Sequence, residues 1–253
     1  MKRGPVLTWI RRIWIAAGLG FTAFLVWSVQ PHGVPAGVLD PGPDLAVSTT
    51  PEGATMFEPA AADPASPVLV LLPGGLVAPR AYLPIARAIA DRGVTLALVP
   101  LPYRSAPSDA SRGVLWTRML EAAARWPDRP LVVGGHSRGG ALAARFVAAH
   151  PGRVAGLILM GTTHPRDEDL SASAVRVLKI LGSRDCVASE RDARANAARL
   201  PATTRWVVIE GANHAQFADY GWQIGDCDAA IDRRTQQGQV VDAILTFMRD
   251  LGR

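Results

Sequence analysis

Residues 131–140 read LVVGGHSRGG, and residues 135–139 within this stretch match the pattern G-x-S-x-G. The apolar run at 131–133 predicts a short buried strand, and the small residues after Gly140 predict a helix. A serine at such a sharp strand-to-helix turn is strained and exposed, so the residues on either side of it have to be small. The stretch therefore predicts an α/β fold and makes Ser137 a candidate nucleophile.

The rest of the chain alternates apolar segments of strand type with segments of helical periodicity. Such alternation forms βαβ units, so we expect a doubly wound, mostly parallel sheet with helices on both faces. The expected strands are residues 44–50, 54–58, 67–73, 94–101, 131–135, 154–161, 175–182 and 205–211, and the expected helices are 79–91, 112–126, 138–149, 188–199 and 232–251. In this fold class the loops that follow the strands carry the site.

Two of these loops supply a candidate acid and a candidate base. Asp185 ends GSRD (182–185) after one strand, and His214 ends GANH (211–214) after the next. A serine nucleophile needs a base that accepts its proton and an acid that orients the base. The order Ser137, Asp185, His214 fits one of the three common arrangements of such a triad. His164 is the rival base, and Glu210 and Asp219 are rival acids that we expect to be structural or solvated.

The first buried strand ends in a Gly-Gly pair, Gly74-Gly75, followed by Leu76. Acyl transfer needs N–H donors for a developing oxyanion, one from the residue after the nucleophile and one from this loop. We therefore expect the amides of Leu76 and Arg138 to form the oxyanion hole. A plain turn would use the same glycines.

The side chain of Arg138 allows two interpretations. A guanidinium beside the nucleophile can pair bidentately with a carboxylate or another anionic group of a substrate. It can equally pair with a nearby acid and face solvent.

The composition limits the classes of partner. The 253 residues are 49% hydrophobic and 19% charged, which fits a globular domain, and the formal net charge is +5. Lys2, Arg3, Arg11 and Arg12 carry almost all of this excess. The remaining chain has no electrostatic reason to bind nucleic acid, and two cysteines are too few for a metal module, so we expect no metal site.

The N-terminal region predicts a membrane anchor. Residues 1–12 are basic, and the uncharged run IWIAAGLGFTAFLVWSV covers residues 13–29. This run is at the short limit for a transmembrane helix, and its basic flank predicts a cytoplasmic N-terminus and an extracytoplasmic domain. The alternatives are the apolar part of a cleaved signal peptide or a core helix. Residues 30–43 are rich in Pro and Gly and predict a linker that lifts domain 44–253 off the membrane.

The motifs resemble those of the α/β-hydrolase superfamily, in particular its small branch without a cap domain, which includes dienelactone-hydrolase-like proteins and simple carboxylesterases. The similarity covers about residues 65–251 and rests on PGGLV (73–77), GHSRGG (135–140), GSRD (182–185) and GANHAQF (211–217). It implies hydrolysis of a small-molecule carboxylic ester through an acyl-enzyme intermediate on Ser137, without a cofactor. Two departures are the serine itself, where dienelactone hydrolases use cysteine, and Arg138, where an apolar residue is common.

The resemblance leaves other functions open. A hydrolase-like domain that binds a ligand without turnover, an acyltransferase and a thioesterase would use the same residues. The long loop 212–231 carries Tyr220 and Trp222, which either form a wall of the substrate pocket or simply pack the loop.

In this fold the acid and base loops are neighbours. The sulfurs of Cys186 and Cys227 are therefore expected to meet, and an exported domain would keep such a disulfide. Two unpaired thiols are the alternative. The localisation that follows is the periplasm or the outer face of a bacterial membrane.

Overall fold

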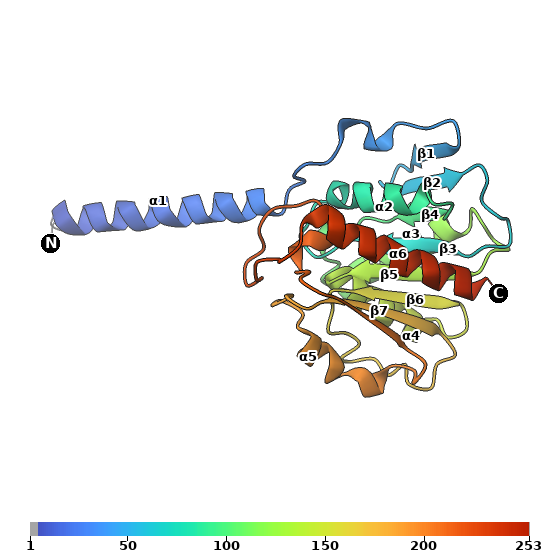
Figure 1. Ribbon diagram of the computed structural model, residues 1–253. Coiled ribbons are helices and arrows are strands. Elements are labelled where there is room, and N and C mark those ends of the chain that lie inside the picture. The colour runs from blue at the N-terminus through green and yellow to red at the C-terminus, as the bar shows by residue number, and fades with distance from the viewer. Residues whose placement is uncertain (1–4, 253) are drawn as a thin grey trace.

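A computed structural model describes residues 5–252 of the chain (Figure 1). Eight strands form one sheet: β1 (Leu45–Thr49), β2 (Thr55–Pro59), β3 (Val68–Leu72), β4 (Leu96–Leu98), β5 (Leu131–His136), β6 (Gly156–Met160), β7 (Arg176–Gly182) and β8 (Arg205–Ile209). Their order is β1-β2-β4-β3-β5-β6-β7-β8. Only the β1–β2 and β2–β4 pairs are antiparallel, and the pairs from β4 to β8 are parallel. The predicted mostly parallel α/β sheet is confirmed.

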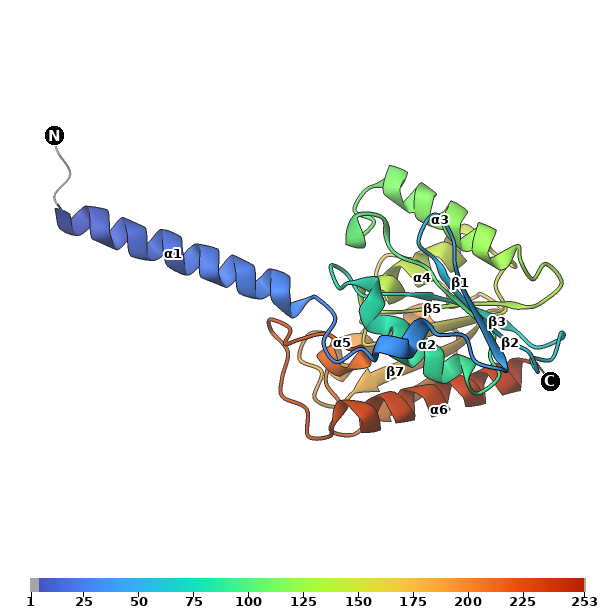
Figure 2. The ribbon, with the colours of Figure 1, turned by 90° about the horizontal axis from the view of Figure 1, so that it is seen from above.

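Helices cover both faces of the sheet (Figures 1 and 2). The helices of the described residues are α1 (Pro5–Ser28), which projects away from the sheet, and α2 (Leu83–Ala90), α3 (Asp109–Ala123), α4 (Arg138–Ala149), α5 (Glu190–Arg194) and α6 (Arg233–Leu251). Helices α2 and α6 pack on one face, and α3 and α4 pack on the other. The predicted helix 188–199 is wrong in length, because the side chain of Asn196 donates to the carbonyl of Asp192 and a separate turn follows at Ala197–Arg199.

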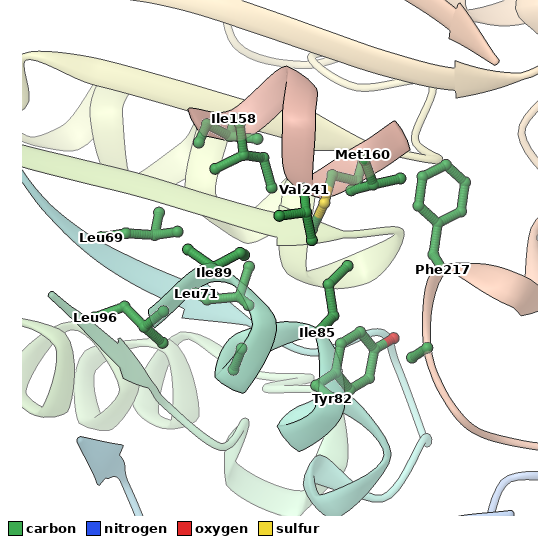
Figure 3. Packing of buried hydrophobic residues seen from close by; sticks show 14 of the residues in the cluster. Leu69, Leu71, Tyr82, Ile85, Ile89, Leu96, Ile158, Met160, Phe217 and Val241 are labelled. Carbon is green, nitrogen blue, oxygen red and sulfur yellow. The ribbon is translucent and has the colours of Figure 1, made fainter. Parts of the chain in front are cut away.

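The strands are apolar on both sides because both sides face a helical layer. Along β3, Leu69 and Leu71 point to α2 and α6, whereas Val68, Val70 and Leu72 point to α3 and α4. Figure 3 shows the first of these cores, in which Ile85 and Ile89 of α2 pack over Leu69 and Leu71. Such continuous apolar runs are typical of parallel strands that are buried on both faces. The sheet thus holds its strand-end loops on a rigid support.

Helix α1 is longer than the predicted apolar run at one end and shorter at the other. It begins at Pro5, includes Arg11 and Arg12, and ends at Ser28. The segment Val6–Ser28 has a mean hydropathy of 1.3 and no buried residue in its most apolar window, so it is long and apolar enough to cross a membrane. A signal sequence near the N-terminus has the same properties.

Residues 30–43 do not form the free linker that their composition predicts. Val38 is buried in the core against α2, and the carbonyls of Val38 and Asp40 accept hydrogen bonds from Arg87 of that helix. His32 donates its backbone N–H to the carbonyl of Asp219 at 2.8 Å. The Pro and Gly residues therefore shape a strap that lies on the domain, because the strap's apolar side chain and carbonyls find partners there.

Candidate active site

Ser137 lies at the tight turn between β5 and α4. Its backbone has φ 52° and ψ −116°, a conformation that a residue with a side chain adopts only under strain. A Cβ on Gly135 would lie well under 3.0 Å from the backbone of Gly139, and a Cβ on Gly139 would meet the carbonyl of Pro73 equally closely. The G-x-S-x-G pattern is therefore a steric requirement of this turn. The first amides of α4 are free to point at the reacting centre.

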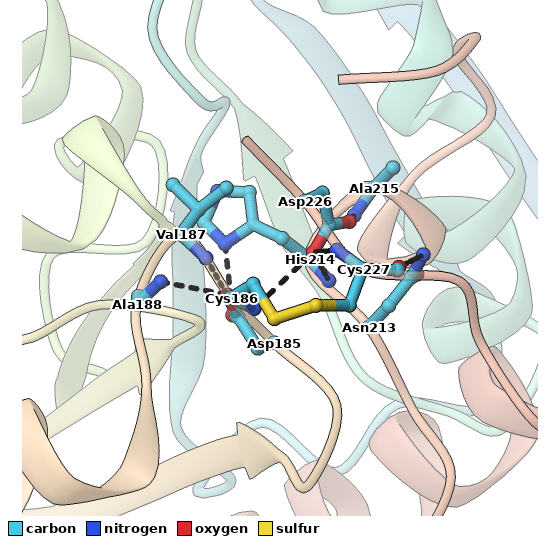
Figure 4. The surroundings of a disulfide bond; sticks show 9 residues. All are labelled: Asp185, Cys186, Val187, Ala188, Asn213, His214, Ala215, Asp226 and Cys227. Atoms are coloured by element: carbon cyan, nitrogen blue, oxygen red, sulfur yellow. Dashed lines mark hydrogen bonds and ion pairs between the residues drawn. A yellow bond between two sulfur atoms is a disulfide. The ribbon is translucent and has the colours of Figure 1, made fainter. Parts of the chain in front are cut away.

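Asp185 and His214 form a buried hydrogen-bonded pair at the same edge of the sheet (Figure 4). Nδ1 of His214 lies 2.8 Å from Oδ2 of Asp185. Oδ1 of Asp185 accepts the N–H groups of Val187 at 2.9 Å and Ala188 at 2.7 Å. These bonds fix the carboxylate, and an imidazole that donates from Nδ1 to Oδ2 in its neutral form carries its lone pair on Nε2.

The residue before Ser137 lies next to this pair. The ring of that residue, His136, lies 4.5 Å from the ring of His214, centroid to centroid. Nε2 of His214 is buried and has no hydrogen-bond partner within residues 5–252. The arrangement leaves that nitrogen able to accept a proton.

The rival residues do not form an acid–histidine pair. The carbonyl of His164 accepts a hydrogen bond from the buried Lys179, and Nδ1 of His164 has no partner among the described residues. The carboxylate of Asp219 accepts from Gln237 at 3.1 Å, and Glu210 is exposed. The described residues pair neither acid with a histidine side chain.

The amide of Leu76 has a different partner from the predicted one. Its N–H donates to the carbonyl of Arg104 at 2.7 Å, and its φ is 65°. This hydrogen bond turns the amide away from the role of an oxyanion donor. The amide of Gly75, one residue earlier, has no hydrogen-bond partner within residues 5–252, and a Cβ on Gly75 would lie 3.0 Å from Cβ of Arg138. Gly75 and the residue after the nucleophile therefore lie side by side.

A hydrogen-bond chain that the sequence did not reveal joins this loop to the nucleophile strand. The N–H of Gly74 donates to the hydroxyl of Tyr82 at 2.8 Å, and this hydroxyl lies 2.6 Å from Nδ1 of His136. Burial lowers the pKa of His136 well below its usual value, and the nearby His214 lowers this pKa further. His136 is therefore neutral and accepts the Tyr82 hydrogen at Nδ1. In the sequence, Tyr82 is only one apolar position of a predicted helix.

The predicted Cys186–Cys227 disulfide is present, with Cα atoms 5.4 Å apart (Figure 4). It joins the residue after Asp185 to the loop that follows His214. Beside it lies Asp226, whose carboxylate accepts the backbone N–H groups of His214 at 3.2 Å and Ala215 at 2.8 Å. The same carboxylate accepts from Cys186 at 3.4 Å. Asp226 thus links the acid loop to the base loop, and no spacing rule in the sequence singled it out.

The side chain of Arg138 does not pair with an acid among the described residues. Its Nε donates to the carbonyl of Ser105 at 3.0 Å and its Nη2 to the carbonyl of Ala106 at 3.3 Å. Burial lowers its pKa, and the nearby Arg145 and Arg112 lower it further. The interpretation as a partner of a nearby acid is wrong, because backbone carbonyls of the loop after β4 occupy these donors.

The two aromatic residues of loop 212–231 have different surroundings. Tyr220 is fully buried, donates its hydroxyl to Gln223 at 2.7 Å and belongs to the core, so it packs the loop instead of lining an open pocket. Trp222 is 47% exposed, and its ring lies 5.9 Å from that of Phe24 in α1. It therefore faces the N-terminal helix.

Comparison with known proteins identifies the family of the chain. A family profile described as "Alpha/beta hydrolase family" matches residues 68–238, about two thirds of the chain, and the chain belongs to this family. Membership of this family makes the chain a hydrolase, and the fold has no cap domain between β6 and β7 among the described residues. No curated protein matches the chain.

Solved structures of several hydrolases share the fold. A bacterial membrane phospholipase A, described as a virulence factor, is 16% identical with a TM-score of 0.57 over 96% of this chain and 98% of its own. A putative dienelactone hydrolase from Klebsiella pneumoniae is 17% identical with a TM-score of 0.54 over 81% and 98%. An esterase from Thermogutta terrifontis is 17% identical with a TM-score of 0.52 over 81% and 95%. At these identities the likeness concerns the fold.

The Tyr82 hydrogen-bond chain gives a first prediction. Tyr82→Phe leaves the buried N–H of Gly74 without a partner, which costs about 1–3 kcal/mol of stability and loosens the loop beside Ser137. We expect kcat for an ester to fall about tenfold while KM changes little. Tyr220→Phe is the matched control, because it removes the other buried tyrosine hydroxyl bond and should leave kcat unchanged. Equal losses of kcat in both variants would refute the positioning role.

The disulfide gives a second prediction. The bridge closes a loop with a sequence separation of 41, for which the chain-entropy model gives about 4 kcal/mol of stabilisation. The double variant Cys186→Ser, Cys227→Ser should therefore melt at a lower temperature than the oxidised wild type. A reductant should lower the melting temperature of the wild type and leave that of the double variant unchanged. Insensitivity of the wild type to the reductant contradicts the prediction.

Proposed function

We propose that the chain is a serine hydrolase that cleaves carboxylic esters through a covalent acyl-enzyme. The observation that carries this proposal is the buried Asp185–His214 pair, whose imidazole ring lies 4.5 Å, centroid to centroid, from the ring of His136, the residue before the strained turn at Ser137. A nucleophile, a base and an orienting acid in this order form a complete unit for acyl transfer. Esterases among the structures of the same fold support this choice of substrate class.

In the proposed mechanism, Oγ of Ser137 attacks the ester carbonyl while Nε2 of His214 accepts its proton. Asp185 holds the imidazole in the correct tautomer and stabilises the imidazolium that forms. The imidazolium then protonates the leaving alcohol. Water attacks the acyl-enzyme with His214 again acting as base, and the carboxylic acid leaves.

The amides that have no hydrogen-bond partner among the described residues are the candidates for the oxyanion hole. We assign the N–H groups of Gly75 and Arg138 to this role, in place of the Leu76 amide, which is bonded to Arg104. An amide at the N-terminus of α4 also brings the positive end of the helix dipole to the developing charge. Each donor contributes on the order of 3 kcal/mol to the transition state. The hydrogen bond of Tyr82 to Gly74 keeps the loop in place.

The catalytic assignment gives a third prediction. Ser137→Ala should remove nearly all hydrolysis of p-nitrophenyl acetate, because the nucleophile is lost, while the melting temperature stays close to that of the wild type. A fluorophosphonate probe should label the wild type and not the variant. Ser171→Ala, at an exposed serine, is the control and should behave as the wild type. A wild type that neither hydrolyses esters nor reacts with the probe would favour a binding domain without turnover.

We further propose that α1 anchors the domain in a membrane, with its N-terminus in the cytoplasm. Basic residues flank the apolar run on the N-terminal side only. The disulfide supports export, because such bonds persist in oxidising compartments. The match to the membrane phospholipase covers 96% of the chain and therefore reaches into α1.

The orientation gives a fourth prediction. Alkaline phosphatase fused to the C-terminus should be active and a green fluorescent protein fused there should be dark, because only the former folds outside the cytoplasm. The same fusions placed after residue 12 serve as controls and should give the opposite result. A bright C-terminal fluorescent fusion would refute the orientation.

A further inference from the structure

Exposed large apolar side chains of the folded domain gather on the loops that follow the strands. They are Leu76 after β3, Tyr103 after β4, Val187 after β7, and Trp222 and Ile224 after β8, with exposed fractions from 39% to 84%. Among the described residues after α1, only Leu39 and Val114 are equally apolar and exposed elsewhere. Apolar side chains gathered in this way mark a surface that meets something other than water. We call these five residues the apolar rim.

The apolar rim lies on the same strand-end loops as the candidate active site. Its loops are joined to one another by the hydrogen bond from Leu76 to Arg104 and by the disulfide between Cys186, next to Val187, and Cys227, three residues after Ile224. The same loops hold Asp185, His214 and Gly75. Whatever covers the rim therefore also covers the entrance to Ser137.

Helix α1 ends on this rim without any free chain between them. The carbonyl of Ser28 accepts the N–H of Gly221 at 2.8 Å, and the carbonyl of Val29 accepts the N–H of Ala78 at 2.9 Å. Ser28 itself is 3% exposed. Both donors belong to the loops that carry the rim. Figure 1 shows α1 leaving the domain from this side.

The length of the apolar segment brings the rim to the bilayer. The uncharged residues from Ile13 to Ser28 span about 24 Å as a helix, less than the roughly 30 Å of a hydrocarbon core. A short segment is accommodated by drawing its flanks toward the core. The flank on the domain side is the rim, and the loops after β3, β4 and β7 each add an exposed arginine, namely Arg80, Arg104 and Arg184. Arginines at this level match lipid phosphates.

We propose that the apolar rim lies on the surface of the membrane that holds α1, and that the site takes an amphiphilic carboxylic ester directly from that bilayer. This proposal rests on the proposed function and names its substrate class. The rim side chains contact the headgroup and upper acyl region, so an ester linkage at this depth reaches Ser137 without crossing water. Hydrolysis consumes one water and returns the carboxylic acid and the alcohol at the same interface.

Photo-crosslinking of the full chain tests the position of the rim. The protein is reconstituted in phosphatidylcholine vesicles that contain a phosphatidylcholine with a diazirine on its acyl chain, and labelled peptides are identified by mass spectrometry. We expect labels on the peptides that contain Tyr103 and residues 222–225, and none on the peptide that contains Val114. Labels confined to residues 5–28 would overturn the proposal, as would labelling of the Val114 peptide to the same extent.

Kinetics of the same vesicles test the route of the substrate. The double variant Tyr103→Asn, Ile224→Ser removes two rim residues that lie outside the catalytic machinery. Its turnover of p-nitrophenyl palmitate dissolved in the bilayer should fall about tenfold, while turnover of soluble p-nitrophenyl acetate stays within about twofold of the wild type. Val114→Ser, at a side chain of similar exposure to Trp222, is the matched control and should change neither rate.

The outcomes separate this proposal from the one on which it rests. Equal losses for both esters, or no loss for the palmitate, would overturn the rim as the route of the substrate. A wild type that cleaves neither ester would refute the proposed function, and the crosslinking pattern would still decide whether the rim contacts lipid.

Discussion

The close backbone contact at the turn of Ser137 is the constraint on which the rest of the structure depends. Gly135 and Gly139 approach each other, and Gly139 also approaches the carbonyl of Pro73, at distances that exclude any side chain. This contact fixes β5, β3 and the start of α4 relative to one another. The two loops that carry the proposed N–H donors and the proposed nucleophile are thereby placed together by backbone sterics. The apolar layers on both faces of the sheet make this placement rigid.

The other half of the site combines close backbone contact with polar bonds. Asp185 and His214 lie in loops after two neighbouring strands, β7 and β8, and a Cβ on Gly182 would lie well under 3.0 Å from the carbonyl oxygen of Ala212. The bonds that join these loops include the Asp185–His214 hydrogen bond, the disulfide, and those of the Asp226 carboxylate, which accepts amides from both loops. Burial raises the pKa of Asp226, whereas its amide donors lower it. The histidine is therefore held by a local polar network in a loop whose Ala212, Ala215 and Phe217 pack in the core.

Sequence reasoning succeeded where one rule determines the structure. The strand-turn-helix at Ser137, the parallel sheet and the cysteine pair each follow from periodicity, sterics or the fold class. It failed where a hydrogen bond depends on a distant partner. The amide of Leu76 is turned by Arg104, and no local pattern indicates that Tyr82 bonds Gly74 and His136. The strap at 30–43 was mistaken for a linker because composition does not reveal contacts with α2.

The fixed joint between α1 and the domain has a mechanical consequence. A helix on a flexible tether tilts independently of its domain, whereas here the carbonyls of Ser28 and Val29 are both bonded to the domain. Any tilt of α1 therefore turns the catalytic domain by the same angle. Because the tilt of a membrane helix depends on bilayer thickness, the thickness would set the angle at which the mouth of the site meets the lipid surface. The orientation of the domain relative to the lipid surface would then depend on the thickness of the membrane that holds α1.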